Sequence, residues 1–384
     1  MTVTVKSFAK INLGLRIGHA REDGFHELLT VYQTIGVYDV IRVSIQRGSG
    51  IEIRCADPRV PLDQTNTCFR IAETAVMALG VKGRVLIEIE KRLPVQGGLG
   101  GASANAVSTL LGLERAARKT LSQGERLQIA AAVGSDLPLF LVGGTVLGVG
   151  RGEQVFPLTD FPATACVVVT PAVGVSTPRA FGEWDRIQGL KGSSSETLNA
   201  TSSARPGQAL RGRSSAVVAA ASAQSERVIG SGGDAASLRS AGTDEGVRPY
   251  TGSKLTVSSP SDRIDELGYG LSAWLSEWYS GAPSKLRGGR AGNPLLALVR
   301  AGIENDFEQV VFPEHPELGE VKRALVRAGA KYASLSGSGS TLYGLFASRK
   351  AADSAVIKLR KAGWSAQATS TLTRAEYWRR LYMT

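Results

Sequence analysis

The sequence of 384 residues is poor in the side chains that commonly bind metals or form disulfide bridges. It holds only three histidines and three cysteines. The cysteines, Cys55, Cys68 and Cys166, are scattered and odd in number, which argues against a disulfide framework and fits a reducing cytoplasm. The scarcity of histidine argues against a multi-histidine metal site. We therefore expect a cytoplasmic protein without a metal cluster.

Long apolar runs are also missing. No stretch of eighteen apolar residues occurs, although 43% of the chain is hydrophobic, so we expect sizeable cores and no membrane partner. The first residues, MTVTVKSFAKINLGL, have the features of neither a signal peptide nor a transit peptide. They alternate polar and apolar side chains, which predicts a strand.

Aromatic residues are absent between Trp184 and Tyr250. Residues 188–262 are mostly Ser, Ala, Gly, Thr and scattered charges, a composition that cannot bury enough apolar surface to offset the entropy of ordering. We predict a disordered insertion there. Order is expected to resume near Arg263, where apolar side chains again share one helical face.

Acidic residues are outnumbered by Lys and Arg, and the net charge is +11. Such a charge attracts either nucleic acid or a small anionic substrate. However, no Arg/Lys block is interleaved with aromatic residues, and the nearest case, RAEYWRRLYMT at the end, equally fits a last amphipathic helix. We therefore favour general basicity over nucleic-acid binding.

Hydrophobic periodicity and turn residues predict both strands and helices along the chain. Ser122 and Glu125 form a capping box for a helix that Gly134 ends. Strands are expected at 37–44, 84–94, 164–171, 332–336 and 341–348, a hairpin at 143–158, and further helices at 102–113 and 316–328.

The most informative stretch is PVQGGLGGASAN at 94–105, which follows a predicted strand and precedes a predicted helix. Free amides at a helix start and flexible glycines make an anion site, and Ser103 can add a hydroxyl. The stretch lacks the Gly-Lys-Ser/Thr of a Walker loop and the third glycine of a dinucleotide fingerprint. A phosphate-binding loop and a structural turn both remain compatible with it.

Three other segments support a phosphate site. Lys10 lies in an otherwise uncharged apolar strand, although a lysine at a strand end can also extend to water. Asp136, in GSDLP, suits a rigid loop but also fits an ordinary cap or Asx-turn. A second Gly/Ser loop, SGSGST at 336–341, has more glycines than a hairpin turn needs.

Together these segments resemble the GHMP kinase family. AKINLGL, DGFHEL, GGLGGASANA, GSDLPLFLVGGTVLGVGRGE and NDFE follow the family's order over residues 4–184 and 293–347. DGFHEL resembles one branch, whose substrate carries a cytidine diphosphate group; that branch usually has Tyr where Phe25 stands. The resemblance implies an α+β fold with a ribosomal-protein-S5-like domain at 1–165 and a ferredoxin-like domain at 166–384. The insertion at 188–262 is foreign to usual members.

The resemblance also implies roles for individual residues. Lys10 and Asp136 are the expected catalytic pair, with Asp136 as the base. ATP is expected to contact the loop, and Mg²⁺ to bridge its phosphates, with the metal's protein ligands unassigned apart from Ser103 as a candidate. Asn305 and Asp306 are expected to form a helix cap at the domain interface. The expected ATP-binding residues are Pro94, Gly97, Gly98, Leu99, Gly100, Gly101, Ala102, Ser103 and Asn105; those for substrate are Asn12, Phe25, His26 and Phe181; the supporting loop is Gly337, Ser338 and Gly339.

The predicted function is therefore ATP-dependent phosphorylation of a small alcohol that carries a cytidine diphosphate group, in isoprenoid precursor synthesis. Two alternatives stay open: another small-alcohol kinase of the family, and a nucleotide- or RNA-binding relative without catalysis. The sequence assigns no oligomeric state.

Overall fold

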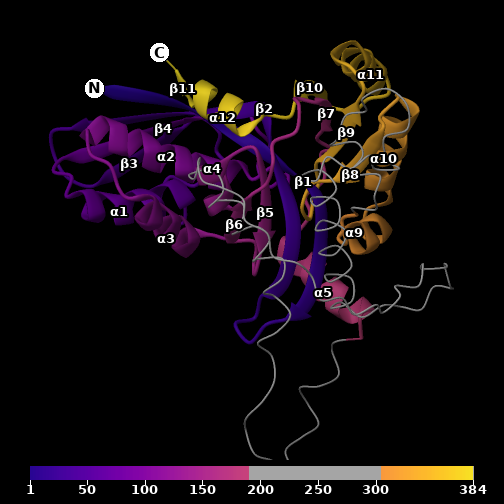
Figure 1. Cartoon of the computed structure of the whole chain (residues 1–384), viewed down its shortest axis with the longest axis horizontal. Helices are drawn as coiled ribbons and strands as arrows, with labels where there is room; N and C mark the ends of the chain where they lie inside the picture. The colour runs from indigo at the N-terminus through magenta and orange to yellow at the C-terminus, as the bar shows by residue number, and fades with distance from the viewer. Residues whose placement is uncertain (190–303, 384) are drawn as a thin grey trace, which may run out of the picture.

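The computed structural model describes residues 1–189 and 304–383. They form two sheets, each with its own helices, which lie side by side (Figure 1). The disordered insertion predicted at 188–262, apart from its first two residues, and the helix expected from Arg263 lie outside the described residues.

The first sheet is built around two long antiparallel strands. β1 (Thr2–Ala20) and β2 (His26–Gln46) pair with irregularities in register after Phe8, Asn12 and Ile17, which allow the strands to bend. The other strands complete the order β11-β1-β2-β4-β3, with β5 on β2 and β6 on β5: β3 (Ile51–Cys55), β4 (Arg84–Glu90), β5 (Thr145–Val149), β6 (Gln154–Pro157) and β11 (Tyr382–Met383). The strands predicted at 37–44 and 84–94 and the hairpin at 143–158 are confirmed.

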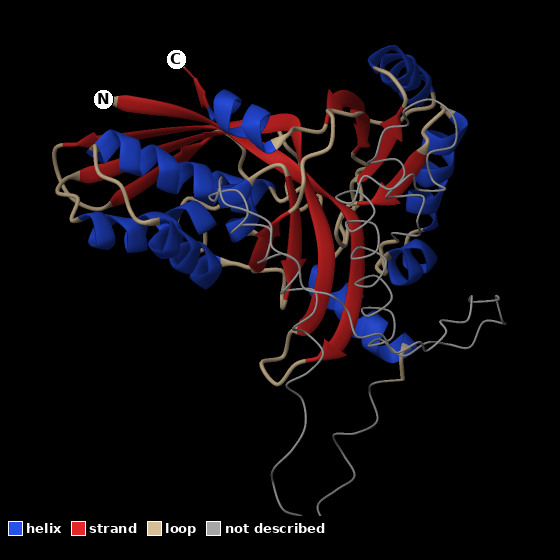
Figure 2. Ribbon diagram, in the orientation of Figure 1, coloured by secondary structure: helices blue, strands red, loops and turns tan. Residues whose placement is uncertain are grey.

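Helices pack along one side of this sheet and enclose its main apolar core (Figure 2). They are α1 (Thr67–Leu79), α2 (Gly101–Ala117), α3 (Gln123–Val133) and α4 (Leu137–Val142). The small, uncharged residues predicted a buried α2, and its residues 104–114 are all buried. Both hydrogen bonds of the Ser122–Glu125 capping box are present and Gly134 ends α3, as predicted.

The second sheet has the strand order β10-β7-β9-β8, with every neighbouring pair antiparallel. Its strands and helices are β7 (Ala165–Val169), α5 (Thr177–Ile187), α9 (Glu308–Glu314), α10 (Pro316–Arg327), β8 (Tyr332–Leu335), β9 (Leu342–Phe346), α11 (Arg349–Lys361) and β10 (Ala366–Ser370). Strands, helices and sheet order are those of a ferredoxin-like domain, so the predicted fold class is confirmed. The prediction for SGSGST is wrong in one respect: the loop does connect a hairpin, because β8 and β9 pair directly.

Main-chain bonds join the long hairpin to segments beside the second sheet at two points along its length. Leu15 of β1 donates to the carbonyl of Glu304 and accepts from the N–H of Asp306, each over 2.9 Å. On β2, Ile35 forms a bridge with Thr371. A shared apolar cluster fills the space between the sheets, so the junction is a packed interface and not a hinge of loops.

The end of the described chain returns to the first sheet. α12 (Arg374–Leu381), the predicted last helix, packs on β1, and β11 then pairs with Thr4 and Val5. The domain boundary at 165/166 stays a prediction, and the structure adds that residues 374–383 lie with the N-terminal strands. None of the helices in the described ranges is long and apolar enough to cross a membrane.

Candidate active site

Lys10 and Asp136 meet at the centre of the molecule. Lys10 lies on β1 with only 3% of its surface exposed, and its Nζ is 3.2 Å from Asp136 Oδ2. The carboxylate is one-third exposed, so one side faces solvent. Because the lysine is buried and paired, it does not extend to water from the strand end. The predicted acid–lysine pair is therefore present in the folded chain.

The main chain places Asp136 without using its carboxylate as a cap. Asp136 stands directly before α4, whose first turn contains Pro138, and the Asp136 side chain makes no capping hydrogen bond. Its second oxygen, Oδ1, instead accepts a hydrogen bond of 3.1 Å from the hydroxyl of Tyr32. The cap and Asx-turn interpretation of Asp136 is thereby excluded, and the carboxylate faces the Lys10 side of the cleft.

Asn12 orients the lysine. Its Oδ1 accepts a 2.7 Å hydrogen bond from Lys10 Nζ, and its Nδ2 donates to the hydroxyl of Thr30 over 2.8 Å. Thr30 in turn donates to the carbonyl of Gly14. This chain of bonds fixes the ammonium group toward Asp136. Because Asn12 lies beside Lys10, it is also next to any molecule that contacts the Lys10–Asp136 pair.

The glycine loop presses against the lysine. Gly98 and Gly100 have φ of +75° and +67°, a region that favours glycine. A Cβ at Gly100 would meet Lys10 Cγ and Phe140 Cζ, both at 3.0 Å. Gly100 is also the N-cap of α2 and provides no side chain to satisfy the first amides of the helix.

The carbonyls of the loop are already used by the protein. Gly97 O accepts from the N–H of Thr341 (3.1 Å), Gly98 O from the hydroxyl of Ser336 (2.9 Å), and Leu99 O from the N–H of Lys10 (3.0 Å). With the oxygens turned toward the protein, the amides at the start of α2 remain to bind an anion. The side chain of Leu99 does not fill this position, because it is buried in the core between the sheets.

The second glycine loop closes over the first. A Cβ at Gly98 would overlap the carbonyl oxygens of Ser336 and Gly339, and one at Gly337 would lie 3.5 Å from Lys10 Nζ. Ser338 shares a 2.7 Å hydrogen bond with Thr177, at the start of α5. The predicted supporting loop therefore does reach the catalytic pair from the second sheet.

Asn305 and Asp306 hold this arrangement at the interface. Asn305 Nδ2 donates to the carbonyls of Leu335 and Gly337, and Asp306 accepts from Arg16 of β1 over 2.8 Å. The predicted helix cap is present in part: Asn305 Oδ1 accepts a 3.0 Å hydrogen bond from the N–H of Phe307 in the turn that leads into α9, although α9 itself begins after Phe307, which provides no side-chain cap. The interface role is confirmed by these contacts.

One other predicted nucleotide-binding residue is buried behind the loop. Asn105 is buried in α2, where its Nδ2 donates to Asp39 over 3.0 Å. Asp39 also accepts from the N–H groups of Arg92 and Leu93, each over 2.7 Å, and so fixes the entry to the loop. In the structure Asn105 supports the loop from behind. Its direct contact with a nucleotide stays a prediction.

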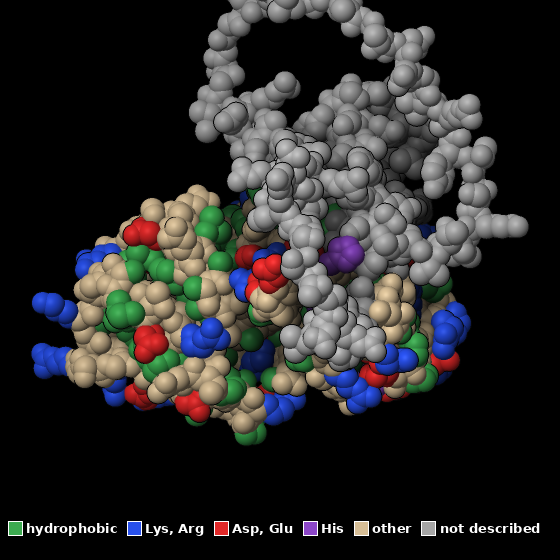
Figure 3. All heavy atoms as spheres, turned by 90° about the horizontal axis from the view of Figure 1, so that it is seen from below, with side chains coloured by type: hydrophobic (Ala, Val, Ile, Leu, Met, Phe, Trp, Pro, Cys, Tyr) green, Lys and Arg blue, Asp and Glu red, His purple; other side chains and the backbone are tan. Residues whose placement is uncertain are grey.

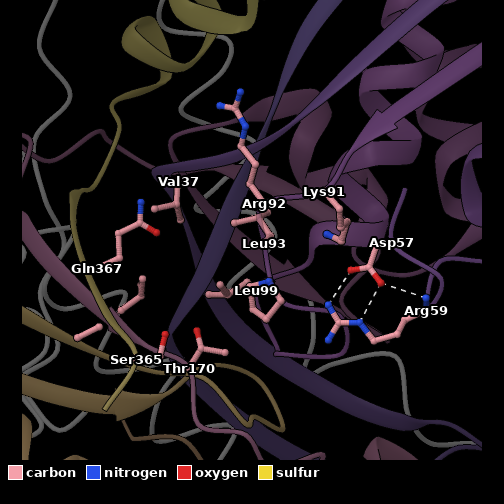
Figure 4. Close-up of a pocket in the computed structure, with 13 residues that line it drawn as sticks. Val37, Asp57, Arg59, Lys91, Arg92, Leu93, Leu99, Thr170, Ser365 and Gln367 are labelled. Carbon is pink, nitrogen blue, oxygen red and sulfur yellow. Dashed lines mark hydrogen bonds and ion pairs between the residues drawn. The ribbon is translucent and has the colours of Figure 1, made fainter. Parts of the chain in front are cut away.

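A pocket of about 340 Å³ opens beside the loop, between the two sheets. Figure 4 shows Val37, Leu93 and Leu99 between the Asp57–Arg59 pair on one side and Ser365 and Gln367 on the other. Its further lining includes Lys91, Arg92, Pro94 and Thr170. Hydrogen bonds from Arg59 lower the pKa of Asp57 to about 2, so the pair stays ionised at neutral pH.

The DGFHEL segment, residues 23–28, lies at the connection between β1 and β2 and forms a second part of the candidate site. His26 is buried, its ring is stacked on Phe181 of α5 (centroids 4.8 Å apart, 11° between planes), and its Nε2 is 2.6 Å from Asp185 Oδ1. Phe25 is half exposed, under the guanidinium of Arg151 at 4.9 Å. Phe181 of α5 thus lies against the His26 ring.

Sequence reasoning missed Tyr32, Asp185, Arg151 and Asp39. Each makes a contact with a residue distant in sequence. Arg151 lies within the quoted segment GSDLPLFLVGGTVLGVGRGE, but nothing in that segment points to its partner Phe25, and the other three stand in no recognisable local pattern. Among the described residues, no group of three or more His, Cys, Asp or Glu side chains is placed to hold a metal.

Comparisons with known proteins agree with this geometry. Family models described as "GHMP kinases N terminal domain" and "GHMP kinases C terminal" match residues 66–144 and 293–363. The chain is 32% identical to the 4-diphosphocytidyl-2-C-methyl-D-erythritol kinase of Solibacter usitatus over 90% of this chain and 82% of that protein. It is 39% identical to the protein of the same name from Rhodococcus jostii, over 48% of this chain and 60% of that one.

Among solved structures, the fold resembles a 4-(cytidine 5'-diphospho)-2C-methyl-D-erythritol kinase. The TM-score is 0.61 at 23% identity, over 96% of this chain and 98% of that one. The resemblance in structure concerns the fold, and the sequence relatives carry the family assignment.

Proposed function

The chain belongs to the GHMP kinase family, and from that premise we propose that it transfers the γ-phosphoryl group of ATP to the 2-hydroxyl of 4-diphosphocytidyl-2-C-methyl-D-erythritol. The observation that carries the proposal is the contact between Lys10 and Asp136 beside the glycine loop. An acceptor hydroxyl and a terminal phosphate that met there would have a base, a cation and free amides within reach.

Asp136 acts as the general base. A carboxylate in hydrogen-bond contact with the acceptor hydroxyl takes its proton as the bond to phosphorus forms. Lys10, fixed by Asn12, keeps Asp136 ionised and offsets the negative charge that develops on the transferred group. Since phosphoryl transfer depends mainly on position and charge, a buried and preset ammonium suits the reaction.

The triphosphate lies on the start of α2. Amides of Gly101, Ala102 and Ser103 have no partner one turn back within the helix, and the helix dipole favours negative charge there. The pocket lined by Lys91, Pro94 and Leu99 adjoins this loop and has room for the nucleoside of ATP. Arg59 and Arg92 on its rim add positive charge.

Mg²⁺ fits the donors in this region. The ion prefers oxygen ligands, keeps several waters and usually takes few ligands from protein when phosphates supply the others. The hydroxyl of Ser103, in the first turn of α2, is the protein oxygen we propose for it. When bound, the metal neutralises charge on the phosphate oxygens.

The cytidine end lies at the DGFHEL turn. We assign recognition of the base to His26 with Phe25 and Phe181, because two aromatic rings and an imidazole gather there at the end of β2. Asp185 holds the imidazole by its Nε2 and leaves the other ring nitrogen for the ligand. The base can contact the edge of the stacked His26–Phe181 pair, or it can stack on the exposed face of Phe25.

The test is an assay of ADP release by the full chain with ATP and Mg²⁺. Release is expected with the cytidylylated alcohol and not with 2-C-methyl-D-erythritol, and ³¹P NMR should place the new phosphate on the 2-hydroxyl. Equal or faster release with the plain alcohol would indicate another small-alcohol kinase and overturn the substrate assignment.

The non-catalytic alternative has one supporting observation, the net charge of +11. On the face seen in Figure 3, cationic and acidic side chains of the described residues are interspersed, and no broad basic field forms there. A salt-sensitive shift of RNA in a gel, together with no turnover of any alcohol, would favour this alternative.

A further inference from the structure

A buried tyrosine completes the contacts of the catalytic carboxylate. Tyr32 lies on β2 with 2% of its surface exposed, directly opposite Asn12 of β1. Its hydroxyl donates to Asp136 Oδ1 over 3.1 Å, while Lys10 lies 3.2 Å from Oδ2. Lys10 Nζ is also 5.5 Å from the centre of the Tyr32 ring. The tyrosine therefore touches both members of the pair.

We propose that Tyr32 is a positioning residue of the phosphoryl transfer, which holds the Asp136 carboxylate in the one rotation that directs a free lone pair at the acceptor hydroxyl. The inference rests on the proposed function and adds Tyr32, as a third side chain, to the pair of Lys10 and Asp136. A carboxylate rotates broadly about its last bond when nothing holds it. Lys10 of β1 and Tyr32 of β2 each hold one oxygen of the Asp136 carboxylate, so this rotation is lost before the substrate binds.

The hairpin of β5 and β6 is shaped to admit this ring. A Cβ at Gly148 of β5 would overlap Tyr32 Cε2, and a Cβ at Gly152 of the hairpin turn would overlap the Tyr32 hydroxyl oxygen. β5 pairs with β2, with Val146 opposite Tyr32. Any larger residue at either glycine would move the ring or its hydroxyl away from Asp136, so the fold reserves space for this contact.

The phenol remains a donor at neutral pH. Burial, and then the charge of Asp136, raise the pKa of Tyr32 well above its ordinary value. The charged groups that face Tyr32 and Asp136 are Lys10 from β1 and Glu153 from the hairpin turn. Because Tyr32 donates to the ionised form of the carboxylate, its removal should make that carboxylate easier to protonate.

The direct test follows the side-chain carboxyl of Asp136 by ¹³C NMR against pH, with its signal identified by its loss in Asp136→Asn. In Tyr32→Phe the midpoint of the titration should move to higher pH, because the ionised carboxylate has lost one of its donors. Tyr38→Phe is the matched control, since Tyr38 is also on β2 but packs on Phe8. An unmoved midpoint in Tyr32→Phe would overturn the proposal.

A kinetic test distinguishes positioning from general support of the fold. In Tyr32→Phe, kcat should fall about tenfold, KM for ATP should stay unchanged, and the acid limb of the kcat profile should move to higher pH. A loss of kcat with an unmoved acid limb and a lower Tm would overturn the proposal. If the carboxyl midpoint moves in Tyr32→Phe but the wild-type chain shows no kinase turnover, the contact would be upheld and the proposed function rejected.

Discussion

The two ends of the proposed active site are built in different ways. The reaction end, which comprises Lys10, Asp136 and the loop at 97–103, is held by main-chain bonds and by partners on neighbouring strands of the first sheet. The recognition end, which comprises Phe25, His26 and Phe181, is held by side chains that meet across the two sheets. The reaction end is therefore fixed by the fold, whereas the recognition end depends on individual side chains that can be exchanged.

This difference predicts that the two ends can be changed independently. A backbone cradle accepts any triphosphate because it binds through amides. Rings contributed by α5 and by the start of β2 can change without disturbing that cradle, and substitutions at the two ends should have separable kinetic effects.

The largest expected effect is at the reaction end. Asp136→Asn removes the base while it keeps the shape of the side chain, and kcat should fall by about 10²–10⁴, the usual worth of general base catalysis. ATP affinity, measured by calorimetry, should change little. Asp353→Asn, at an exposed pair on α11, is the control and should leave kcat unaltered. Near-full turnover by Asp136→Asn would remove Asp136 from its proposed role.

A second variant tests the backbone itself. In Gly98→Ala the new methyl group would overlap the carbonyl of Ser336 at a φ of +75°, so the two glycine loops should separate. We expect KM for ATP to rise about tenfold or more, since such strain costs of order 1–3 kcal/mol. Gly124→Ala, in α3 with open space around it, should instead raise Tm slightly. An unchanged KM for ATP would show that loop contact is dispensable.

The recognition end should respond in substrate affinity alone. Asp185→Ala frees the His26 ring, and KM for the cytidylylated alcohol should rise about tenfold, as expected when a hydrogen bond to a charged group is lost. The kcat value and KM for ATP should stay within about twofold because the reaction end is linked to α5 through Ser338 and Thr177, and not through Asp185. Arg186→Ala, exposed on the same helix, is the control. A loss confined to kcat would contradict the division into two ends.

The smallest effect belongs to neither end. Ser122→Ala removes the capping box of α3 and should cost about 1 kcal/mol of unfolding free energy, measured by urea titration. Both KM values and kcat should remain those of the wild type at a temperature well below Tm. A change in either KM would mean that α3 is coupled to the cleft.

The sequence predicted the reaction end better than the recognition end for a physical reason. Lys10, Asp136 and the glycines stand in local patterns, because a buried charge or a positive φ restricts the residues around it. Tyr32 and Asp185 act through partners distant in the chain, so their neighbours in sequence carry no trace of the contact. The same holds for Phe181: its place on α5 was predictable, but its stacking on His26 depends on how the two sheets pack.

Glycines were also easier to locate than to interpret. Those at 337 and 339 suggested a loop with a function, which argued against a hairpin, yet the chain does both at once. Gly148 and Gly152 lie in the hairpin predicted at 143–158, and the structure shows that their missing side chains leave room for Tyr32. A sequence records that a side chain is absent but not which neighbour needs the space.

The pairing of β11 with β1 sets an order of events in synthesis. Thr4 and Val5 are synthesised before nearly all of the described residues, and their partners, Met383 and Tyr382, after them. Until then β1 presents an unpaired edge that can join another chain. Nascent chains that stop before α12 should therefore aggregate more readily than full-length ones, even though the residues of the cleft have already been made.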